Sequence, residues 1–413
     1  MLGNAYAEPL APGVGMGLSL LDPQTGALRP LRARPGRPFS IYVCGPTVYD
    51  DPHVGHARTY LLFDVARRQL LADGVRVREV MNITDFEDKI FDRAVGLGVP
   101  WKRLARSEER RFLADLGRLH ILPADLYPRA SDHVPQMRRA VRALERTRRL
   151  ELRDQGLVYR PAERTRRSLG AGSEASRHVV PEPRTPNPDG LELGEFSVWL
   201  PPHPGGPAWP SPWGPGTPGW HLECYVMSRQ YLGLPVDLHG GGRDLVFPHH
   251  YAESELARAL DHDRFSRHYL YGDFVTQNGV KMSKSTGNLV RIESAIEDGG
   301  AGAVRWYLLS THYARPIEWD ARGLAAARTT VEAVRGAFGS ALRDRGGGSM
   351  PIEALDRLGE GVVRDLSRDL GTERALARIA RFAQELGRAP RGAFPRGDRR
   401  RALRRISEIE ARL

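Results

Sequence analysis

The chain has 413 residues, with 61 Lys and Arg against 50 Asp and Glu, so its formal net charge is +11. This length and a hydrophobic content of 41% suit two or three packed domains, and no apolar run approaches the roughly 20 residues that span a bilayer. The N-terminus lacks the basic start and apolar block of a signal peptide, so we expect a cytoplasmic protein. The positive charge fits a polyanionic partner such as RNA, or simply an arginine-rich composition.

Residues 1–38, rich in Pro and Gly, are expected to form an N-terminal arm. Residues 40–44 (SIYVC) predict a buried strand that ends at a Gly-Pro pair. Residues 57–72 have helical periodicity, and residues 75–83 predict a second strand. This order is typical of a Rossmann-type parallel α/β sheet, whose ligand site lies at the carboxyl ends of the strands.

The rest of the sequence predicts an insertion followed by a helical C-terminal region. Residues 99–158 read as mainly helical, and residues 160–219, rich in Pro and Gly, as long loops across the active-site side. We therefore expect a catalytic domain over 39–310 with an insertion at about 95–215. Residues 311–413 are expected to form a helical domain, with helices at 321–342 and near 352–369, 371–387 and 398–412, and a glycine-rich linker over 343–350.

The segment His53-Val54-Gly55-His56 follows the first predicted strand and lies at the start of the predicted helix. A helix N-terminus offers N–H donors and a positive dipole end to phosphate. Gly55 would let a base or ribose approach the backbone, and the imidazoles can donate to phosphate oxygens as charge builds on them. Alone, these four residues also fit a helix cap with surface histidines.

Residues 279–288 read GVKMSKSTGN, with Lys281 and Lys284 beside small hydroxyl residues. Such a loop suits closure on a triphosphate, where the lysines would neutralise charge in the transition state. A basic surface loop is the alternative. The chain has four lysines, at positions 89, 102, 281 and 284, so the motif retains ammonium groups where the chain otherwise uses arginine. This favours the functional interpretation.

Cys44, Cys224, His249 and Glu253 are a candidate metal site. Cys44 ends the first predicted strand, and His249 and Glu253 are spaced i, i+4 in FPHHYAESE, so they share one face if a helix starts at the proline. Two thiolates, an imidazole and a carboxylate are a reasonable tetrahedral set for Zn²⁺. No CxxC pair is present, isolated cysteines are often buried hydrophobes, and His250, about 100° around the helix, is the competing imidazole.

Together these residues resemble the class I aminoacyl-tRNA synthetases, and the cysteinyl-tRNA synthetases in particular. Five segments match in the family's order: residues 42–59 (YVCGPTVYDDPHVGHART), 82–90 (NITDFEDKI), 209–224 (WPSPWGPGTPGWHLEC), 239–253 (HGGGRDLVFPHHYAE) and 281–288. The likeness covers roughly residues 16–340. It implies a Rossmann-type α/β catalytic domain with inserted loops and helices and a C-terminal helical bundle.

The resemblance implies a ligase that forms cysteinyl-adenylate from L-cysteine and ATP, with Mg²⁺ accompanying ATP, and transfers cysteine to tRNA(Cys). Zn²⁺ would be held by the four candidate metal ligands and would bind the substrate thiolate, so that serine is rejected without an editing domain. The residues expected to be catalytic are His53, His56, Lys281 and Lys284. The residues expected to bind ATP or cysteine are Gly45, Thr47, His53, Gly55, His56, Thr59, Asn82, Thr84, Trp220, Gly242, Asp244 and Lys284.

Some features depart from the family. Residues 160–195 match poorly, Tyr251 and Ala252 replace an acidic residue and an asparagine, and the chain stops before a full anticodon-binding domain. The mycothiol-pathway ligases, which pass cysteine to an amino-sugar, share the core and the short end. The features that favour the synthetase are residues 46–49 (PTVY), Arg58, Lys89 and Glu253.

Three hypotheses on function stay open: transfer of cysteine to tRNA(Cys), transfer to a small-molecule amine or a carrier protein, and a non-catalytic RNA-binding paralogue. The arginine-rich helix near 398–412 could grip RNA or be ordinary solvated surface. We expect a monomer with no membrane partner.

Overall fold

The computed structural model describes residues 17–23, 25–162, 191–282, 287–343, 352–388 and 399–413. Its centre is a four-stranded sheet in the order β10-β9-β3-β4, and every neighbouring pair is parallel. The strands are β3 (Phe39–Val43), β4 (Val77–Met81), β9 (Val236–Gly242) and β10 (Ser266–Gly272). All five residues of β3 are buried, as the apolar sequence predicts for a central parallel strand. The expected Rossmann-type sheet is confirmed.

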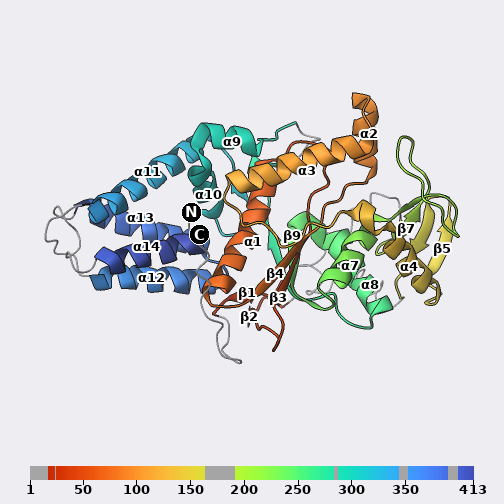
Figure 1. Ribbon diagram of the computed structural model, residues 1–413, viewed down its shortest axis with the longest axis horizontal. Coiled ribbons are helices and arrows are strands. Elements are labelled where there is room, and N and C mark those ends of the chain that lie inside the picture. Colours follow the sequence, from red (N-terminus) through yellow and green to blue (C-terminus); the bar gives the residue numbers. More distant parts are fainter. Residues whose placement is uncertain (1–16, 24, 163–190, 283–286, 344–351, 389–398) are drawn as a thin grey trace.

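Helix α1 (Val54–Ala72) connects β3 to β4 and is buried over most of its length. It packs against β4, β9 and β10 and, on its other side, against α10 and α14. Because both sides are covered, its apolar residues surround the axis instead of forming one stripe. The helix therefore starts at the carboxyl end of β3, between the sheet and the C-terminal helices (Figure 1).

The segment between β4 and β9 includes residues 95–215, which were predicted to form an insertion, and two of the elements predicted there are wrong. It contains α2 (Asp88–Leu97), α3 (Trp101–Arg118), a short helical turn η1 (Ala130–His133), α4 (Val134–Glu145) and α7 (Trp220–Tyr231). An antiparallel sheet in the order β5-β6-β7-β8 lies beside them. Its strands are β5 (Leu150–Arg153), β6 (Gly156–Tyr159), β7 (Phe196–Leu200) and β8 (Thr217–Pro218).

The helical prediction for residues 99–158 is thus wrong over its last ten residues, which begin a β-hairpin, and the loop prediction for 160–219 misses β7 and β8. The hairpin turns at Asp154-Gln155-Gly156, and the Gly156 φ of 109° is one that other residues rarely adopt. Residues 163–190, most of the poorly matched segment, lie outside the described residues.

Beyond β10 the chain forms a small sheet and then helices. The small sheet has the order β12-β11-β13. Its strands are β11 (Val275–Gln277), β12 (Val280–Lys281) and β13 (Ile317–Glu318). The helices are α9 (Ile292–Gly299), α10 (Ala301–Leu309), α11 (Ala321–Arg343), α12 (Ile352–Ser367), α13 (Thr372–Arg388) and α14 (Arg399–Arg412). The four predicted C-terminal helices are confirmed to within a few residues, and the predicted linker lies almost wholly outside the described residues.

The N-terminal arm contributes an antiparallel pair, β1 (Ser19–Leu21) and β2 (Leu28–Pro30), which reaches the C-terminal helices through the hydrogen bond from Leu21 N to Asp369 Oδ1. The described residues contain no helix long and apolar enough to cross a membrane. The division into an arm, a catalytic domain and a helical domain stays a prediction. The helical bundle and the β5–β8 sheet lie at opposite ends of the molecule, with the parallel sheet between them (Figure 1).

Candidate active site

The four predicted metal ligands come together at the carboxyl end of the parallel sheet. Cys44 follows β3 directly, Cys224 lies in the second turn of α7, and Glu253 lies in the first turn of α8 (Tyr251–Leu260). His249 belongs to the irregular turn η3 (Val246–His250) that leads into α8. All four residues are buried, and one ligand atom from each lies within 4.8 Å of the others.

The distances in this cluster fit a tetrahedral metal site. Two thiolates on one Zn²⁺ lie about 3.8 Å apart at Zn–S bonds of about 2.3 Å, and the Sγ atoms of Cys44 and Cys224 are 3.7 Å apart. His249 Nε2 lies 3.3 Å from Glu253 Oε1, close to the separation of a nitrogen and an oxygen ligand on one ion. His249 Nε2 is also buried without a hydrogen-bond partner. In its neutral form, this buried ring nitrogen offers a lone pair to a metal cation.

The charges in the cluster agree with this interpretation. Burial would raise the pKa of the Cys224 thiol, but the hydrogen bond from Cys44 and the charge of His249 outweigh it and lower that pKa to about 6. Burial opposes the charged form of His249, but Glu253 and Cys224 raise its pKa to about 10. At neutral pH a thiolate therefore faces an imidazolium, and a metal cation can replace the imidazolium proton.

Three more histidines surround these residues; of the three, only His250 was considered from the sequence, as the competing imidazole. His239 donates from Nε2 to Glu253 Oε2 at 2.8 Å, and His221 lies 3.1 Å from His249 through the Nδ1 atoms. His250 Nε2 lies 3.3 Å from Cys44 Sγ, so the expectation that it points away from the cluster is wrong. The reason is the irregular entry to α8, where Phe247 has non-helical φ and ψ. The HGGG segment that includes His239 was the available signal.

Gly45, Asn82 and Thr84 form the wall beside the metal cluster. A Cβ on Gly45 would lie 1.6 Å from the carbonyl oxygen of Asn82, so this position admits only glycine. Gly45 N donates to Asn82 Oδ1 at 2.8 Å, and Asn82 Nδ2 donates to Thr84 Oγ1 at 3.2 Å. Thr84 then donates to the buried carboxylate of Glu223 at 2.9 Å. Glu223, next to Cys224, is a site residue that sequence reasoning missed.

The His53–His56 segment caps α1 as the sequence suggested, and it does so with its own side chains. Gly55 N donates to His53 Nδ1 at 3.1 Å, and His53 N donates to His56 Nδ1 at 3.3 Å. The two rings stack with centroids 3.9 Å apart. Because Nδ1 accepts in both rings, this hydrogen-bond network assigns the ring protons to Nε2.

Backbone hydrogen bonds join the His53–His56 segment to the residues that follow the lysine motif of residues 279–288. Val54 N donates to Val290 O at 2.9 Å, and Ile292 N donates to Pro52 O at 3.1 Å, just beyond the lysine motif. Lys281 Nζ forms an ion pair with Asp244 Oδ2 at 2.9 Å, so two of the predicted residues contact each other directly. Lys284 lies outside the described residues.

The remaining predicted residues lie at the same edge of the sheet. Thr47 pairs with Thr84 through a parallel bridge, and Trp220 stacks on His249 with ring centroids 4.2 Å apart. Thr59 Oγ1 donates to Gly55 O at 3.4 Å, and a Cβ on Gly242 would lie 4.0 Å from that hydroxyl. The structure therefore brings the described candidate residues to one edge of the sheet, while the role of each stays a prediction.

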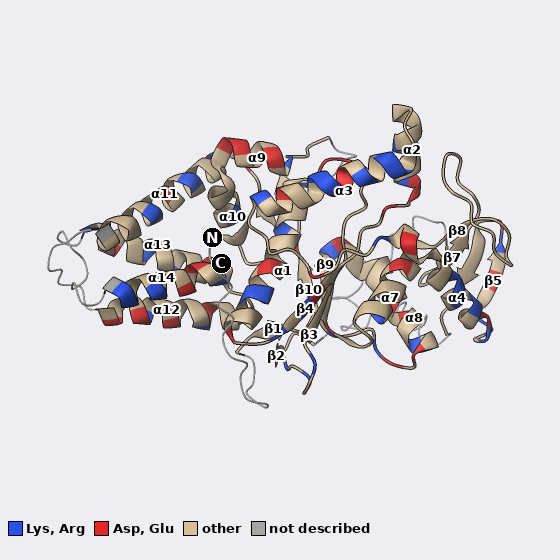
Figure 2. Ribbon diagram, viewed as in Figure 1, with Lys and Arg blue, Asp and Glu red and all other residues tan. Residues whose placement is uncertain are grey.

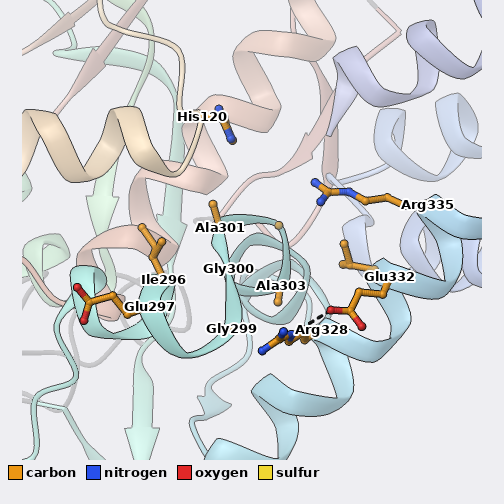
Figure 3. A pocket seen from close by; sticks show the side chains of 12 residues that line it. His120, Ile296, Glu297, Gly299, Gly300, Ala301, Ala303, Arg328, Glu332 and Arg335 are labelled. Carbon is orange, nitrogen blue, oxygen red and sulfur yellow. Dashed lines mark hydrogen bonds and ion pairs between the residues drawn. The ribbon is translucent and has the colours of Figure 1, made fainter.

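A hollow of about 470 Å³ lies elsewhere, between the ends of α3, α9 and α10 and the side of α11 (Figure 3). Its lining includes His120, the Gly299–Ala303 backbone, Arg328, Glu332 and Arg335. Arg328 is a candidate anion ligand by charge, but its guanidinium is already paired with Glu332 at 3.0 Å. None of the residues predicted to bind ATP, cysteine or metal lines this hollow, so it is separate from the candidate active site.

Solved structures similar to this chain share its fold. A methionyl-tRNA synthetase from Mycobacterium tuberculosis bound to methionyl-adenylate matches with a TM-score of 0.65 at 16% identity, over 85% of this chain and 82% of that one. A LeuRS–tRNA–LeuAMS complex from Agrobacterium radiobacter K84 matches with a TM-score of 0.63 at 13% identity, over 92% and 84% of the two chains.

Relatives found by sequence have a higher identity to this chain than these solved structures. Cysteine–tRNA ligases from Aeropyrum pernix and Thermococcus onnurineus are 38% and 39% identical over 340 and 312 residues. The matches cover 81% and 76% of this chain and 70% and 65% of those proteins, so the chain spans about two thirds of their length. Residues 32–329 match the family model described as tRNA synthetases class I (C) catalytic domain. With this match over most of its length, the chain belongs to the class I (C) family of tRNA synthetase catalytic domains.

Proposed function

We propose that the chain activates L-cysteine with ATP and transfers the cysteinyl group to tRNA(Cys). The observation that carries this proposal is the buried cluster of Cys44, Cys224, His249 and Glu253, which lies at the same sheet edge as the His53–His56 helix start. The relatives at 38–39% identity, named cysteine–tRNA ligases, support it.

Selection of cysteine would occur at the cluster. Its four ligands would hold Zn²⁺, which when bound supplies a Lewis-acidic position that takes a sulfur ligand readily and a hydroxyl poorly. Trp220, stacked on His249, would cover the amino acid beside the metal ligands, and Thr84 would line the same pocket. The hydrogen-bond chain through Asn82 fixes the Thr84 hydroxyl, so this wall is organised before substrate binds.

Activation would occur at the start of α1. The cysteine carboxylate attacks the α-phosphorus of ATP, an oxygen–phosphorus bond forms, and pyrophosphate leaves as cysteinyl-adenylate is made. His53 and His56, each with the ring proton on Nε2, would donate to phosphate oxygens, assisted by the positive end of the helix. Lys281 and Lys284 would neutralise charge on the phosphates, and Mg²⁺ would accompany ATP. Lys281 would exchange its ion pair with Asp244 for one with phosphate.

Transfer would complete the reaction. A terminal ribose hydroxyl of tRNA attacks the carbonyl carbon of the adenylate, an ester forms, and AMP leaves. Because the ligand set already discriminates sulfur from oxygen, a second site for hydrolysing misacylated tRNA is unnecessary.

Two assays on one preparation test the proposal: ATP–pyrophosphate exchange with cysteine, and charging of tRNA(Cys) with labelled cysteine. Both reactions should proceed, with exchange at least 100-fold slower with serine. Exchange without charging would move the acceptor to a small-molecule amine or a carrier protein. Absence of both would leave a non-catalytic RNA-binding paralogue, and comparable exchange with serine would refute thiolate selection by the metal.

A further inference from the structure

A tight hairpin turn comes just before Lys281. Strands β11 and β12 pair antiparallel with Thr276 opposite Lys281, which leaves Asn278 and Gly279 as the two turn residues. We call these two residues the 278–279 turn. Both have positive φ, 54° and 73°, as a two-residue hairpin of the Asn-Gly type requires. Because β12 has only two residues and the turn is exposed, the position of Lys281 depends on what holds this turn.

The carboxylate of Glu318, on β13, accepts hydrogen bonds from the turn and from the strand before it. Glu318 Oε2 accepts from Thr276 Oγ1 at 2.6 Å and from Gly279 N at 3.2 Å, and the backbone of Asn278 also donates to this carboxylate. The hydrogen bond from Thr276 lowers the pKa of Glu318 below its ordinary value, so the side chain is anionic at neutral pH. Hydrogen bonds to an ionised acceptor are stronger than neutral ones. One side chain therefore holds both residues of the 278–279 turn.

The backbone around Glu318 is itself fixed. Strand β13 pairs parallel with β11, and the neighbours of Glu318 on either side, Ile317 and Trp319, are buried. Trp319 N donates to Thr276 O at 2.7 Å, and Tyr307 Oη, on α10, donates to Glu318 O at 2.5 Å. The small sheet and α10 thus give the carboxylate a fixed support from which it can hold an exposed turn.

The same contacts bear on the position of Lys281. Lys281, Thr276 and Glu318 form one row across the small sheet, because each lies opposite the next in register. The ammonium of Lys281 lies 4.1 Å from the centroid of the Phe274 ring and pairs with Asp244 at 2.9 Å. Glu318 therefore fixes both the residue opposite Lys281 and the turn that precedes it.

We propose that Glu318 is a positioning residue for adenylate formation, whose carboxylate holds the 278–279 turn so that Lys281 meets the phosphates of ATP from a fixed strand. The inference rests on the proposed function, because that function assigns Lys281 to the phosphates. Glu318 acts through Lys281 and not on the reacting atoms. A cation stabilises charge in a transition state best when it is held in place beforehand, so a loosened hairpin should lower kcat more than it weakens binding of cysteine.

The test compares variants of the full chain in cysteine-dependent pyrophosphate exchange. Glu318→Ala should lower kcat about tenfold through the lost charge-assisted hydrogen bonds. The KM for cysteine, the zinc content and the urea midpoint should stay at their wild-type values, a split that a general loss of structure would not give. Glu318→Gln keeps an acceptor oxygen and should recover part of kcat. Thr276→Val/Glu318→Ala should lose no more than Glu318→Ala alone, because the Thr276 hydroxyl acts through the carboxylate.

A matched control is available on α12. This helix carries several acidic residues in the helical bundle (Figure 2), and it packs against α13 and α14. One of them, Glu360, is exposed, so Glu360→Ala removes the same side chain far along the sequence from the hairpin and should leave exchange unchanged.

Hydrogen exchange of the backbone amides gives a readout that is independent of activity. The amides of Asn278 and Gly279 both donate to Glu318, so a peptide covering residues 275–282 should exchange faster in Glu318→Ala. The same peptide should exchange at the wild-type rate in Glu360→Ala.

Three results would overturn the inference alone: an unchanged kcat in Glu318→Ala, an unchanged amide exchange of the 275–282 peptide, or a further loss of kcat in the double variant. Loss of zinc or a raised KM for cysteine in parallel with kcat would also overturn it, since the effect would then be on the fold. A wild-type protein without cysteine-dependent exchange would overturn the proposed function, and this inference with it.

Discussion

Substitution of Gly45 by alanine should lower both the stability of the fold and its affinity for zinc. The added Cβ would lie 1.6 Å from Asn82 O and 2.7 Å from Asn82 C, and both atoms belong to backbone that cannot rotate away. Relief requires a shift of more than 1 Å, which would also break the hydrogen bond from Gly45 N to Asn82 Oδ1. Overpacking of about 1–3 kcal/mol and a lost hydrogen bond of about 1 kcal/mol together destabilise the fold by about 2–4 kcal/mol.

The same shift displaces the adjacent Cys44. Metal–ligand distances tolerate changes of only about 0.2 Å, so Gly45→Ala should bind zinc at least tenfold more weakly. Urea unfolding and zinc titration measure the two effects. Gly96→Ala in α2 is the control, because a Cβ there meets no atom within 4 Å and alanine favours the helix. A Gly45→Ala protein with the unfolding midpoint and zinc affinity of wild type would refute the reasoning.

Three further outcomes are expected. Cys224→Ser should lose bound zinc and cysteine-dependent pyrophosphate exchange, since serine is a poor zinc ligand; unchanged metal content would remove Cys224 from the ligand set. Lys284→Ala should slow adenylate formation far more than it weakens cysteine binding, and equal losses would contradict a transition-state role. Burial raises the pKa of Glu79 to about 8, above its value in the unfolded chain, so folding takes up a proton and stability falls as pH rises from about 4.5 to 8. Glu79→Gln should therefore be more stable than wild type at pH 8 by about 1 kcal/mol or more in urea unfolding, and an unchanged pH dependence would show that Glu79 is ionised in the fold.

The sequence predicted the parallel sheet and the C-terminal helices well because their patterns are local. The buried run at β3 and the periodicity of α11–α14 are each set by neighbouring residues. The hairpin at residues 150–159 was missed because its strands are short and follow a helical, charged segment. Its turn signal at Gly156 was present but was outweighed.

The candidate metal site could not be found from local sequence patterns alone. Its candidate ligands come from three separate segments, so spacing alone gave a weak signal, and the family resemblance supplied the set. His250 was misplaced because an ideal helix was assumed through residues 246–250, whereas Phe247 interrupts it. Glu223 and His239 were not found because their importance depends on Thr84 and Glu253, contacts that only the folded chain brings together.

The backbone bonds at Val54 and Ile292 also attach the residues that follow the lysine motif to the start of α1. Met282 N donates to Val275 O, and Val290 O accepts from the first turn of α1, so both flanks of the motif are attached to the catalytic core. Seven residues separate these two anchors, and a chain of that length reaches at most about 25 Å when fully extended. If Lys284 engages ATP as proposed, a tether of this length gives it a high local concentration near the start of α1, which lowers the entropic cost of that contact.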